Sequence, residues 1–280
     1  MHVELTGAAA RAAAAVASHL RGTAPLGVAY SGGVDSATLL ALAVRALGAE
    51  NVVAILGISP SLATDERARA HRTAAVIGVP VVEIETHEGD SQAYRANGPD
   101  RCFHCKDELF TRIDDDLVTE LGLQAVAYGE NADDAARPDR PGGQAATNHA
   151  VLRPLAAAGV DKAGVREIAR QLGLAVADKP AAPCLASRIP HFHEVTPEKL
   201  AQVDRAEAGL RRLGFTDCRV RHHEEVARIE VLAEEIARAA ELREEVHAVI
   251  TAAGFRFAAL DLRGIQSGAF TLPLVQVTGG

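Results

Sequence analysis

A short glycine-rich loop near the N-terminus has the residue types that bind phosphate. It consists of Ser31, Gly32, Gly33, Val34, Asp35 and Ser36, and it lies between an apolar run and a helical pattern. Glycines let the backbone approach phosphate closely, and a helix N-terminus presents N–H groups with positive dipole character. The two serine hydroxyls can add donors. The loop lacks the Gly-x-x-x-x-Gly-Lys pattern that positions a γ-phosphate. An ordinary glycine turn is the alternative.

The four cysteines are a second group that could do chemistry. They are Cys102, Cys105, Cys184 and Cys218. In a cytosolic chain a disulfide framework is not expected, and a Cys-x-x-Cys pair there suggests metal or redox chemistry. Cys184 lies in a proline-flanked loop, with Arg188 four residues later and Lys179 five residues earlier. Positive neighbours favour the thiolate, which is the attacking form. A buried structural cysteine is the alternative for Cys184, and packing is the expected role of Cys218.

Three of these cysteines match the ligand number of an open iron–sulfur cluster. Cys102, Cys105 and Cys184 could hold three irons of a 4Fe-4S cluster and leave the fourth iron open for an extra sulfide. Structural zinc usually needs four ligands, and His104 as the fourth would require awkward local geometry. The sequence favours the cluster, with a zinc site and a plain thiol pair as alternatives.

Two arginines near the C-terminal end could bind an anion. Arg219 and Arg221 are two residues apart, so on a strand they share one face. Two guanidinium groups on one face suit a bidentate phosphate clamp. A pair of solvated strand arginines is the alternative. His191 and His193 fall in a predicted loop, and we assign them no role.

The elements that must position these residues follow an alternating pattern. The predicted strands are residues 26–30, 52–58, 81–85 and 125–128, and the predicted helices are residues 36–47, 64–77, 106–121 and 163–172. Short β-branched runs bounded by turn residues indicate buried strands. Alternation of strand and helix predicts an α/β fold with a doubly wound parallel sheet, in which ligands bind beyond the carboxyl ends of the strands. Residues 129–134 (GENADD) follow the fourth strand at that edge, although an acidic surface turn would have the same composition.

The composition changes near Pro180, and a second, smaller α+β domain is expected after it. Thr196 and Pro197 open a helix that extends to about Leu213. Residues 219–231 alternate as two strands around a His-His-Glu-Glu turn, and residues 255–262 form a last strand. We therefore predict a first domain over residues 1–188 and a second over residues 189–280.

Composition and charge exclude several classes of protein. The 280 residues are 48% hydrophobic and 24% charged, with a net charge of -8. Disorder does not fit these values, and a nucleic-acid partner is disfavoured because phosphate binding usually requires positive charge. No run of about 18 apolar residues predicts a membrane helix, and the N-terminus lacks the pattern of a signal peptide. A cytoplasmic location with no membrane partner is expected.

The loop at residues 31–36 resembles the PP-loop of the N-type ATP pyrophosphatases, which split ATP between the α and β phosphates. Three further stretches, residues 101–106 (RCFHCK), 183–188 (PCLASR) and 219–221 (RVR), resemble the LarE family within that superfamily. These are ATP-dependent sulfur transferases of nickel-pincer nucleotide biosynthesis, whose product later carries nickel for lactate racemase. The resemblance spans nearly the whole chain, and residues 183–188 are its most specific part.

The resemblance implies a reaction, cofactors and site residues. Pyridinium-3,5-biscarboxylic acid mononucleotide would be adenylylated with ATP and Mg²⁺, releasing pyrophosphate, and each carboxylate would then become a thiocarboxylate, releasing AMP. Implied ATP-binding residues are Ser31, Gly32, Gly33, Asp35, Ser36 and Gly129, and implied catalytic residues are Cys184 and Asp35. Implied substrate-binding residues are Arg188, Glu207, Arg219 and Arg221. The family also forms homo-oligomers, often hexamers, and uses sulfide or another sulfur donor.

Two sulfur sources occur among the proteins that this chain resembles. Where a lone cysteine stands at the position of Cys184, it gives up its own sulfur and ends as dehydroalanine. This chain departs from that pattern because it also contains Cys102 and Cys105. Members with three cysteines carry a cluster and draw on a renewable sulfur source.

Three other functions are compatible with parts of the sequence. A PP-loop enzyme with Cys-x-x-Cys and a third cysteine can thiolate tRNA, but the net charge of -8 speaks against this. An amidotransferase-type synthetase would need no cysteine. A non-catalytic nucleotide sensor on the same fold would release no pyrophosphate.

Overall fold

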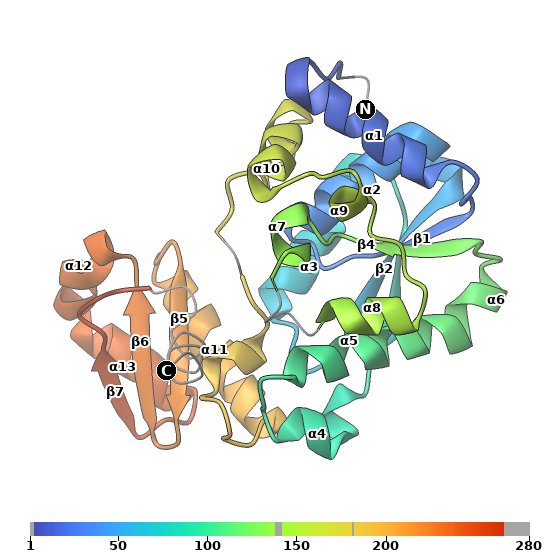
Figure 1. Ribbon diagram of the computed structural model, residues 1–280. Helices are drawn as coiled ribbons and strands as arrows, with labels where there is room; N and C mark the ends of the chain where they lie inside the picture. The colour runs from blue at the N-terminus through green and yellow to red at the C-terminus, as the bar shows by residue number, and fades with distance from the viewer. Residues whose placement is uncertain (1–2, 138–141, 181, 266–280) are drawn as a thin grey trace, which may run out of the picture. The chain divides into compact units, whose positions relative to one another are not determined.

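The computed structural model describes residues 3–137, 142–180 and 182–265 (Figure 1). The chain divides into two compact units. The first unit comprises Met1–Ser59, Asp65–Glu88 and Cys102–Ala182, and the second comprises Pro60–Thr64, Gly89–Arg101 and Pro183–Gly280. The domain boundary after Arg188 stays a prediction. The two short excursions of the chain into the second unit were not indicated by any local sequence pattern.

A four-stranded parallel sheet forms the centre of the first unit. Its strands are β1 (Leu26–Ala29), β2 (Val52–Ile58), β3 (Val81–Glu85) and β4 (Ala125–Tyr128), in the order β3-β2-β1-β4. All four were predicted. The chain moves outward from β1 to β3 and then returns to the other side of β1, so the order reverses between β1 and β4. Ligands of such sheets bind at this switch point.

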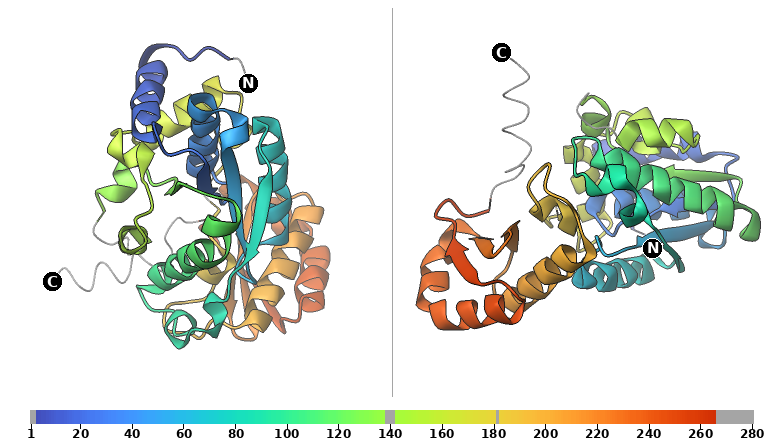
Figure 2. Two further views of the ribbon diagram at one scale, coloured as in Figure 1. Left: turned by 90° about the vertical axis from the view of Figure 1, so that its right-hand side faces the viewer. Right: turned by 90° about the horizontal axis from the view of Figure 1, so that it is seen from below.

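Helices cover both faces of this sheet, as the left view of Figure 2 shows. In chain order the helical elements of this part of the chain are α1 (Gly7–Leu20), α2 (Val34–Leu47), η1 (Ala49–Asn51), α3 (Thr64–Ile77), η2 (Glu88–Asp90), α5 (Arg101–Arg112), the π-turn η3 (Ile113–Leu117), α6 (Val118–Glu120), α7 (Ala132–Ala135), α8 (Gly142–Asn148), α9 (Pro154–Ala157) and α10 (Lys162–Gln171). On one face Ile55 and Tyr128 pack with Phe110 of α5 and Ala145 of α8. Helix α2 contacts β1 and β2, and α1 and α10 pack against α2.

One predicted helix begins earlier than its sequence pattern indicated. We expected it to start near Lys106, with the Cys-x-x-Cys pair in the preceding loop, but α5 starts at Arg101. Cys102 and Cys105 therefore lie within the first turns of a helix, on one face, because residues three apart are neighbours there. The early start follows from a tertiary contact. The side chain of Arg101 is buried and donates to Ala186 O, 85 residues later in the chain, which a local pattern cannot reveal.

The second unit is a small α+β structure. Its helical elements are α4 (Gln92–Arg95), η4 (Leu185–Arg188), α11 (Pro197–Arg212), η5 (Ala233–Glu235), α12 (Ile236–Glu241) and α13 (Arg243–Ala252), and its strands are β5 (Cys218–His223), β6 (Val226–Val231) and β7 (Phe257–Leu260). β5 and β6 are antiparallel, and β6 and β7 are parallel. The predicted cap of α11 is confirmed, because Thr196 Oγ1 accepts a hydrogen bond from Lys199 N at 3.3 Å. β7 is shorter than the predicted strand.

No helix within residues 3–137, 142–180 and 182–265 is long and apolar enough to cross a membrane.

Candidate functional site

The loop between β1 and α2 has the shape of an anion-binding loop. Gly32 has a φ of 73°, a conformation that favours glycine, and a Cβ there would lie 2.9 Å from the Cβ of Ala70. The hydroxyl of Ser36 lies 3.2 Å from Ser31 N and 3.2 Å from Ser31 Oγ. This serine pair closes the loop over the start of α2, where backbone N–H groups point toward the sheet edge.

Gly129 lets the loop after β4 approach the loop after β1. A Cβ at this position would lie 2.7 Å from Ser36 N and 2.8 Å from the carbonyl carbon of Asp35. Real Cβ atoms do not approach backbone atoms so closely, so any larger residue would push the two loops apart. The sequence placed both loops at one edge of the sheet, and the structure brings them into contact at the switch point between β1 and β4.

The carboxylate of Asp35, in the first turn of α2, is held by two partners. Asn131 Nδ2 donates to Asp35 Oδ1 at 3.0 Å, and Lys162 Nζ lies 2.5 Å from Asp35 Oδ2. The other end of the Asn131 amide caps α7, because its Oδ1 accepts from Asp134 N at 3.0 Å. Lys162 is the first residue of α10. Three elements thus converge on one carboxylate at the edge where a phosphate would bind.

Sequence reasoning missed two of these residues. Asn131 stood in the stretch 129–134 that we noted, but its contact with Asp35 was not foreseen. Lys162 follows the helix cap Asp161, whose side chain accepts from Gly164 N at 2.7 Å. The cap signal places a lysine at the start of a helix, and only the sheet topology shows which carboxylate it meets.

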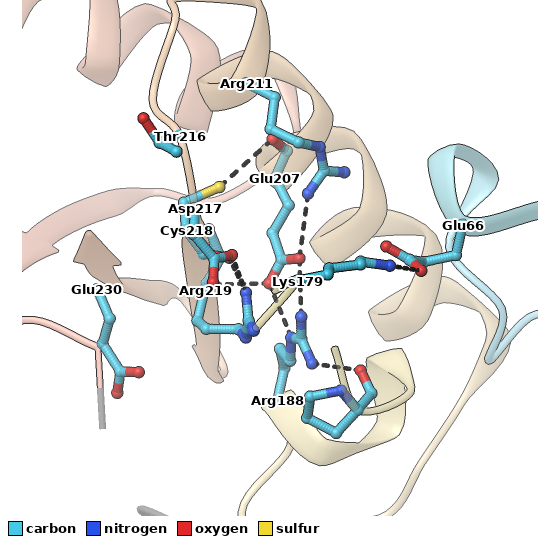
Figure 3. Close-up of polar contacts among 12 residues, drawn as sticks. Glu66, Lys179, Arg188, Glu207, Arg211, Thr216, Asp217, Cys218, Arg219 and Glu230 are labelled. Atoms are coloured by element: carbon cyan, nitrogen blue, oxygen red, sulfur yellow. Dashed lines mark hydrogen bonds and ion pairs between the residues drawn. The ribbon is translucent and has the colours of Figure 1, made fainter. Parts of the chain in front are cut away.

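Lys179, which the sequence indicated as a positive neighbour of Cys184, is engaged in the first unit. Its ammonium group pairs with Glu66 of α3 (Figure 3). Glu66 also pairs with Arg69, at 2.6 Å. Burial raises the pKa of Glu66, but the hydrogen bond and charge of Lys179 outweigh burial and lower it. In this structure the charge of Lys179 is balanced by Glu66.

The cysteines differ in their surroundings. Cys102 and Cys184 are exposed, Cys105 is half-buried, and no disulfide joins any of the four cysteines, all of which lie in described residues. Cys218 is fully buried, and burial raises the pKa of its thiol to about 12, so it stays protonated and packs as we expected. Within the described ranges, no group of three or more His, Cys, Asp or Glu side chains is arranged to hold a metal ion.

The loop that carries Cys184 is fastened by Arg188. Its guanidinium forms two hydrogen bonds to Glu207 of α11, at 2.8 and 3.0 Å, and it donates to the carbonyl oxygen of Pro183 at 2.7 Å. Figure 3 shows the Glu207 carboxylate between the guanidiniums of Arg188 and Arg211. Burial lowers the pKa of Arg188, but the Glu207 charge outweighs it and raises the pKa.

Arg219 and Arg221 lie on β5, as predicted, and both are buried. Arg219 pairs with Asp217 and donates to the carbonyl oxygen of Cys218 at 2.9 Å. Arg221 forms two hydrogen bonds to Glu230, at 3.0 and 2.8 Å, and a third to Ser187 O at 3.0 Å. The alternative of solvated strand arginines is therefore wrong. Binding of substrate by these two arginines, Arg188 and Glu207 stays a prediction.

The histidines near these loops make ordinary polar contacts. His191 Nδ1 lies 3.1 Å from Asn97 O, and His193 Nδ1 lies 3.5 Å from Glu224 Oε1. His104 is half-buried beside Phe103, with ring centroids 5.3 Å apart.

Comparison with known proteins places the chain in a family. The family model of asparagine synthase matches residues 8–116, which span the phosphate loop. The chain is 43% identical over 244 residues to the uncharacterized protein slr1717 of Synechocystis, covering 86% of this chain and 90% of that protein. It is 33% identical over 241 residues to the pyridinium-3,5-bisthiocarboxylic acid mononucleotide synthase of Lactiplantibacillus plantarum, covering 86% and 87% of the two chains.

A third relative extends the same pattern. The uncharacterized protein MJ0830 of Methanocaldococcus jannaschii is 28% identical over 171 residues, covering 61% of this chain and 66% of that protein. The phosphate loop at the switch point, together with 33% identity across most of both chains to the Lactiplantibacillus synthase, confirms the resemblance drawn from residues 31–36, 101–106, 183–188 and 219–221. The chain belongs to the LarE family of PP-loop, ATP-dependent sulfur transferases.

Proposed function

We propose that this protein activates the carboxylates of pyridinium-3,5-biscarboxylic acid mononucleotide with ATP and converts them to thiocarboxylates. The observation that carries the proposal is the glycine-lined contact between the loops after β1 and β4, in a chain 33% identical to a synthase named for the bisthiocarboxylic product. The product of the proposed reaction is the pyridinium nucleotide that later holds nickel.

The phosphate loop would hold the pyrophosphate part of ATP. The backbone N–H groups at the start of α2 and the hydroxyls of Ser31 and Ser36 are hydrogen-bond donors, and Gly32 and Gly129 allow the close backbone packing that shapes the loop. Carboxylate oxygens are preferred ligands of Mg²⁺, so Asp35 would contact the metal that accompanies ATP. Lys162, which lies beside Asp35, would add a positive charge near the phosphates of ATP.

The chemistry proceeds by two displacements. A substrate carboxylate oxygen attacks the α-phosphorus of ATP, the bond to the β-phosphate oxygen breaks, and pyrophosphate leaves from the loop. A sulfur nucleophile then attacks the acyl carbon, and AMP leaves with its electron pair. Positive groups around the loop stabilise the charge that develops on the leaving pyrophosphate. Two rounds convert both carboxylates.

Analysis of the products tests this proposal. The protein should release AMP and pyrophosphate when it is given ATP, Mg²⁺ and the biscarboxylic mononucleotide, with total tRNA in place of the mononucleotide as the control. Release of ADP and inorganic phosphate would contradict the proposal. Pyrophosphate release with tRNA alone would favour tRNA thiolation instead.

We further propose that Cys102, Cys105 and Cys184 hold a 4Fe-4S cluster with one open iron. Two observations support this ligand set: these three thiols are exposed or half-buried while Cys218 is buried, and Cys102 and Cys105 share one face of α5. When bound, such a cluster would supply a renewable sulfide to the activated substrate. A sacrificial Cys184 that ends as dehydroalanine is the competing sulfur source.

Anaerobic purification separates the two sulfur sources. A cluster predicts a brown protein with about four irons per chain, turnover beyond one sulfur per chain when sulfide is supplied, and an intact Cys184 by mass. Replacement of Cys102 or Cys105 by Ser should bleach the protein. A colourless protein whose Cys184 loses the mass of H₂S after one turnover would establish the sacrificial source.

The phosphate of the mononucleotide requires a cation, and Arg219 is the better of the two predicted clamp residues. Its carboxylate partner, Asp217, is 21% exposed, whereas Glu230, the partner of Arg221, is 1% exposed. Arg219 can therefore exchange its partner for a phosphate at lower cost. Charge-assisted hydrogen bonds contribute about 1.5–3 kcal/mol, so Arg219→Ala should weaken mononucleotide binding about tenfold or more and leave ATP binding unchanged.

Further parts of the proposal concern partners and location. By resemblance the protein forms homo-oligomers, up to a hexamer, which size-exclusion chromatography with light scattering would measure. It takes sulfide or another small sulfur donor and no nucleic acid. Because ATP and reduced thiols are both cytoplasmic, we place the reaction in the cytoplasm.

A further inference from the structure

The loop that follows Cys184 is bonded to one buried asparagine. Asn97 Nδ2 lies 3.2 Å from Ile189 O, 2.8 Å from Pro190 O and 3.1 Å from His193 O. Its side chain is fully buried. The backbone of Asn97 joins the same contact, because Phe192 N donates to Asn97 O at 3.1 Å. Asn97 thus bonds to the backbone on both sides of the loop segment 189–193.

Arg101 continues this contact toward Cys184. Its Nη1 donates to Ala186 O at 3.0 Å and to Asn97 Oδ1 at 2.5 Å. Arg101 is 8% exposed. Ala186 lies two residues after Cys184, in the short helix η4 that Cys184 caps. All of these residues belong to the second unit, and the bonds run from segment 89–101 to the loop after Pro183.

The backbone of Asn97 restricts which residue can stand at this position. Its φ is 56°, in the left-handed region that side chains other than asparagine, aspartate and glycine rarely adopt. The guanidinium of Arg101 is buried, and a buried charge is expensive to desolvate. Such a charge persists only where surrounding contacts compensate for it, and Ala186 O and Asn97 Oδ1 are among those contacts.

We propose that Asn97 and Arg101 are positioning residues that fix Cys184 for sulfur transfer. The inference rests on the proposed role of Cys184. Neither residue has to contact the substrate, because both act through the backbone of residues 186–193. This arrangement serves either sulfur source.

The positioning role separates the two halves of the reaction. Adenylylation uses the phosphate loop of the first unit, to which Asn97 and Arg101 do not belong. Sulfur delivery requires Cys184 in a defined place. Loss of the hydrogen bonds from Asn97 and Arg101 to residues 186–193 should therefore leave pyrophosphate release intact and reduce formation of the thiocarboxylate.

Two variants test this in the full-length protein. Asn97→Gly removes the side chain but permits the positive φ, and Arg101→Lys keeps the charge but loses the planar fork. Arg238→Lys is the matched control, because Arg238 also donates to backbone carbonyls, those of Gly214 and Leu213, which lie outside residues 183–193. Hydrogen exchange of residues 185–195 and the rate of Cys184 alkylation by iodoacetamide are measured without substrate.

The expected result is exchange and alkylation about tenfold faster in both variants, since each loses a hydrogen bond of a buried group, with the control unchanged. Thiocarboxylate formation should fall about tenfold or more, while single-turnover pyrophosphate release stays within about twofold. Unchanged exchange and alkylation would overturn the inference, as would an equal fall in both half-reactions. If the wild-type protein releases no pyrophosphate, the proposed function fails. The hydrogen-exchange and Cys184 alkylation rates still decide whether Asn97 and Arg101 position the loop.

Discussion

The ion pairs beside the phosphate loop and beside the Cys184 loop differ in their access to water. In the phosphate-loop region, the side chains of Asp35 and Lys162 are 21% and 38% exposed. In the second unit, Arg188 and Glu207 are 4% and 1% exposed, and Glu230 is equally buried. A partly hydrated ion pair can exchange one partner for a ligand at low cost. A buried pair cannot, because a charge left without its partner in a medium of low dielectric constant is strongly destabilising.

This difference assigns the two regions different tasks. The first unit holds charges that can turn toward ATP and its metal, and its glycines keep the backbone within reach. The second unit uses charge to fix the shape of the loops around Cys184. We therefore expect substitution of Asp35 or Lys162 to affect catalysis more than stability, and substitution of Glu207, in its buried pair with Arg188, to do the reverse.

Removal of the carboxylate at Asp35 should have the largest effect on activity. Asp35→Ala takes away the expected contact to Mg²⁺, and we expect pyrophosphate release to fall by on the order of 10³. The melting temperature should change by no more than a few degrees, because the carboxylate is partly hydrated. Asp178→Ala, which removes a well-exposed partner of Arg170, is the control. A large loss of stability in Asp35→Ala would contradict the distinction between the partly hydrated pair at the phosphate loop and the buried pairs of the second unit.

Glu207→Ala should have the largest effect on stability. It leaves Arg188 buried without its carboxylate and also removes the acceptor of Val220 N at 2.9 Å. Loss of one partner of a buried pair typically costs about 3–5 kcal/mol. Urea unfolding measures this free energy. Glu224→Ala, at an exposed pair with Lys199, should cost below about 1 kcal/mol, and similar values for the two variants would contradict the assignment.

Lys162→Ala should have an intermediate effect, on ligand binding alone. The affinity for Mg²⁺-ATP should fall about tenfold, since one cation near the phosphates contributes about 1.5 kcal/mol. Stability should change by less than about 1 kcal/mol, because the ion pair is partly exposed. Isothermal titration with ATP and Mg²⁺ measures the affinity. An unchanged value would remove Lys162 from the phosphate site.

The smallest effect is expected at His149, which lies between two carboxylates of the first unit. Its Nδ1 is 2.7 Å from Asp114 Oδ2, and its Nε2 is 3.1 Å from Asp107 Oδ1. Burial lowers the pKa of His149, but the hydrogen bonds to Asp114 and Asp107 outweigh it and raise the pKa above the ordinary 6.5.

The sign of the pH dependence follows from this shift. Because the folded pKa is raised, the stabilisation is fully present below about pH 6.5 and is lost as the pH rises through the folded pKa. The difference in unfolding free energy between the wild type and His149→Gln should be below about 1 kcal/mol and should shrink as the pH rises. A difference that grows with pH would show that His149 is neutral in the folded protein.

The strands of the sheet were predictable from sequence because each is a short apolar run that ends at turn residues. Residues 52–58, 81–85 and 125–128 match β2, β3 and β4, and helix α3 matches its predicted span. The placement of the phosphate loop and Gly129 at the same edge of the sheet followed from the rule that parallel strands end at one edge. Local composition and one topological rule were sufficient for these features.

The contacts that fix the cysteine loop were not predictable in this way. Asn97 carries no local signal, since its three acceptors lie more than 90 residues away. The sequence suggested a phosphate clamp at Arg219 and Arg221, but it did not show that Asp217 and Glu230 supply carboxylates to these two arginines. Ion pairs and side chain-to-backbone bonds depend on which segments meet in the folded chain. The hydrophobic periodicity of a sequence predicts helices and strands but does not show which distant segments come into contact.

The interleaving of the two units has a consequence for biosynthesis. The chain passes between them after Ser59, Thr64, Glu88, Arg101 and Ala182, so no single cut separates one unit from the other. During translation Asn97 leaves the ribosome about ninety residues before its carbonyl partners do. The nascent chain must therefore hold segment 89–101 unsatisfied until residues 186–193 have been made. A polypeptide that ends at residue 188 would lack three of those carbonyls, and it would expose a buried asparagine and arginine to the chaperones that bind incomplete chains.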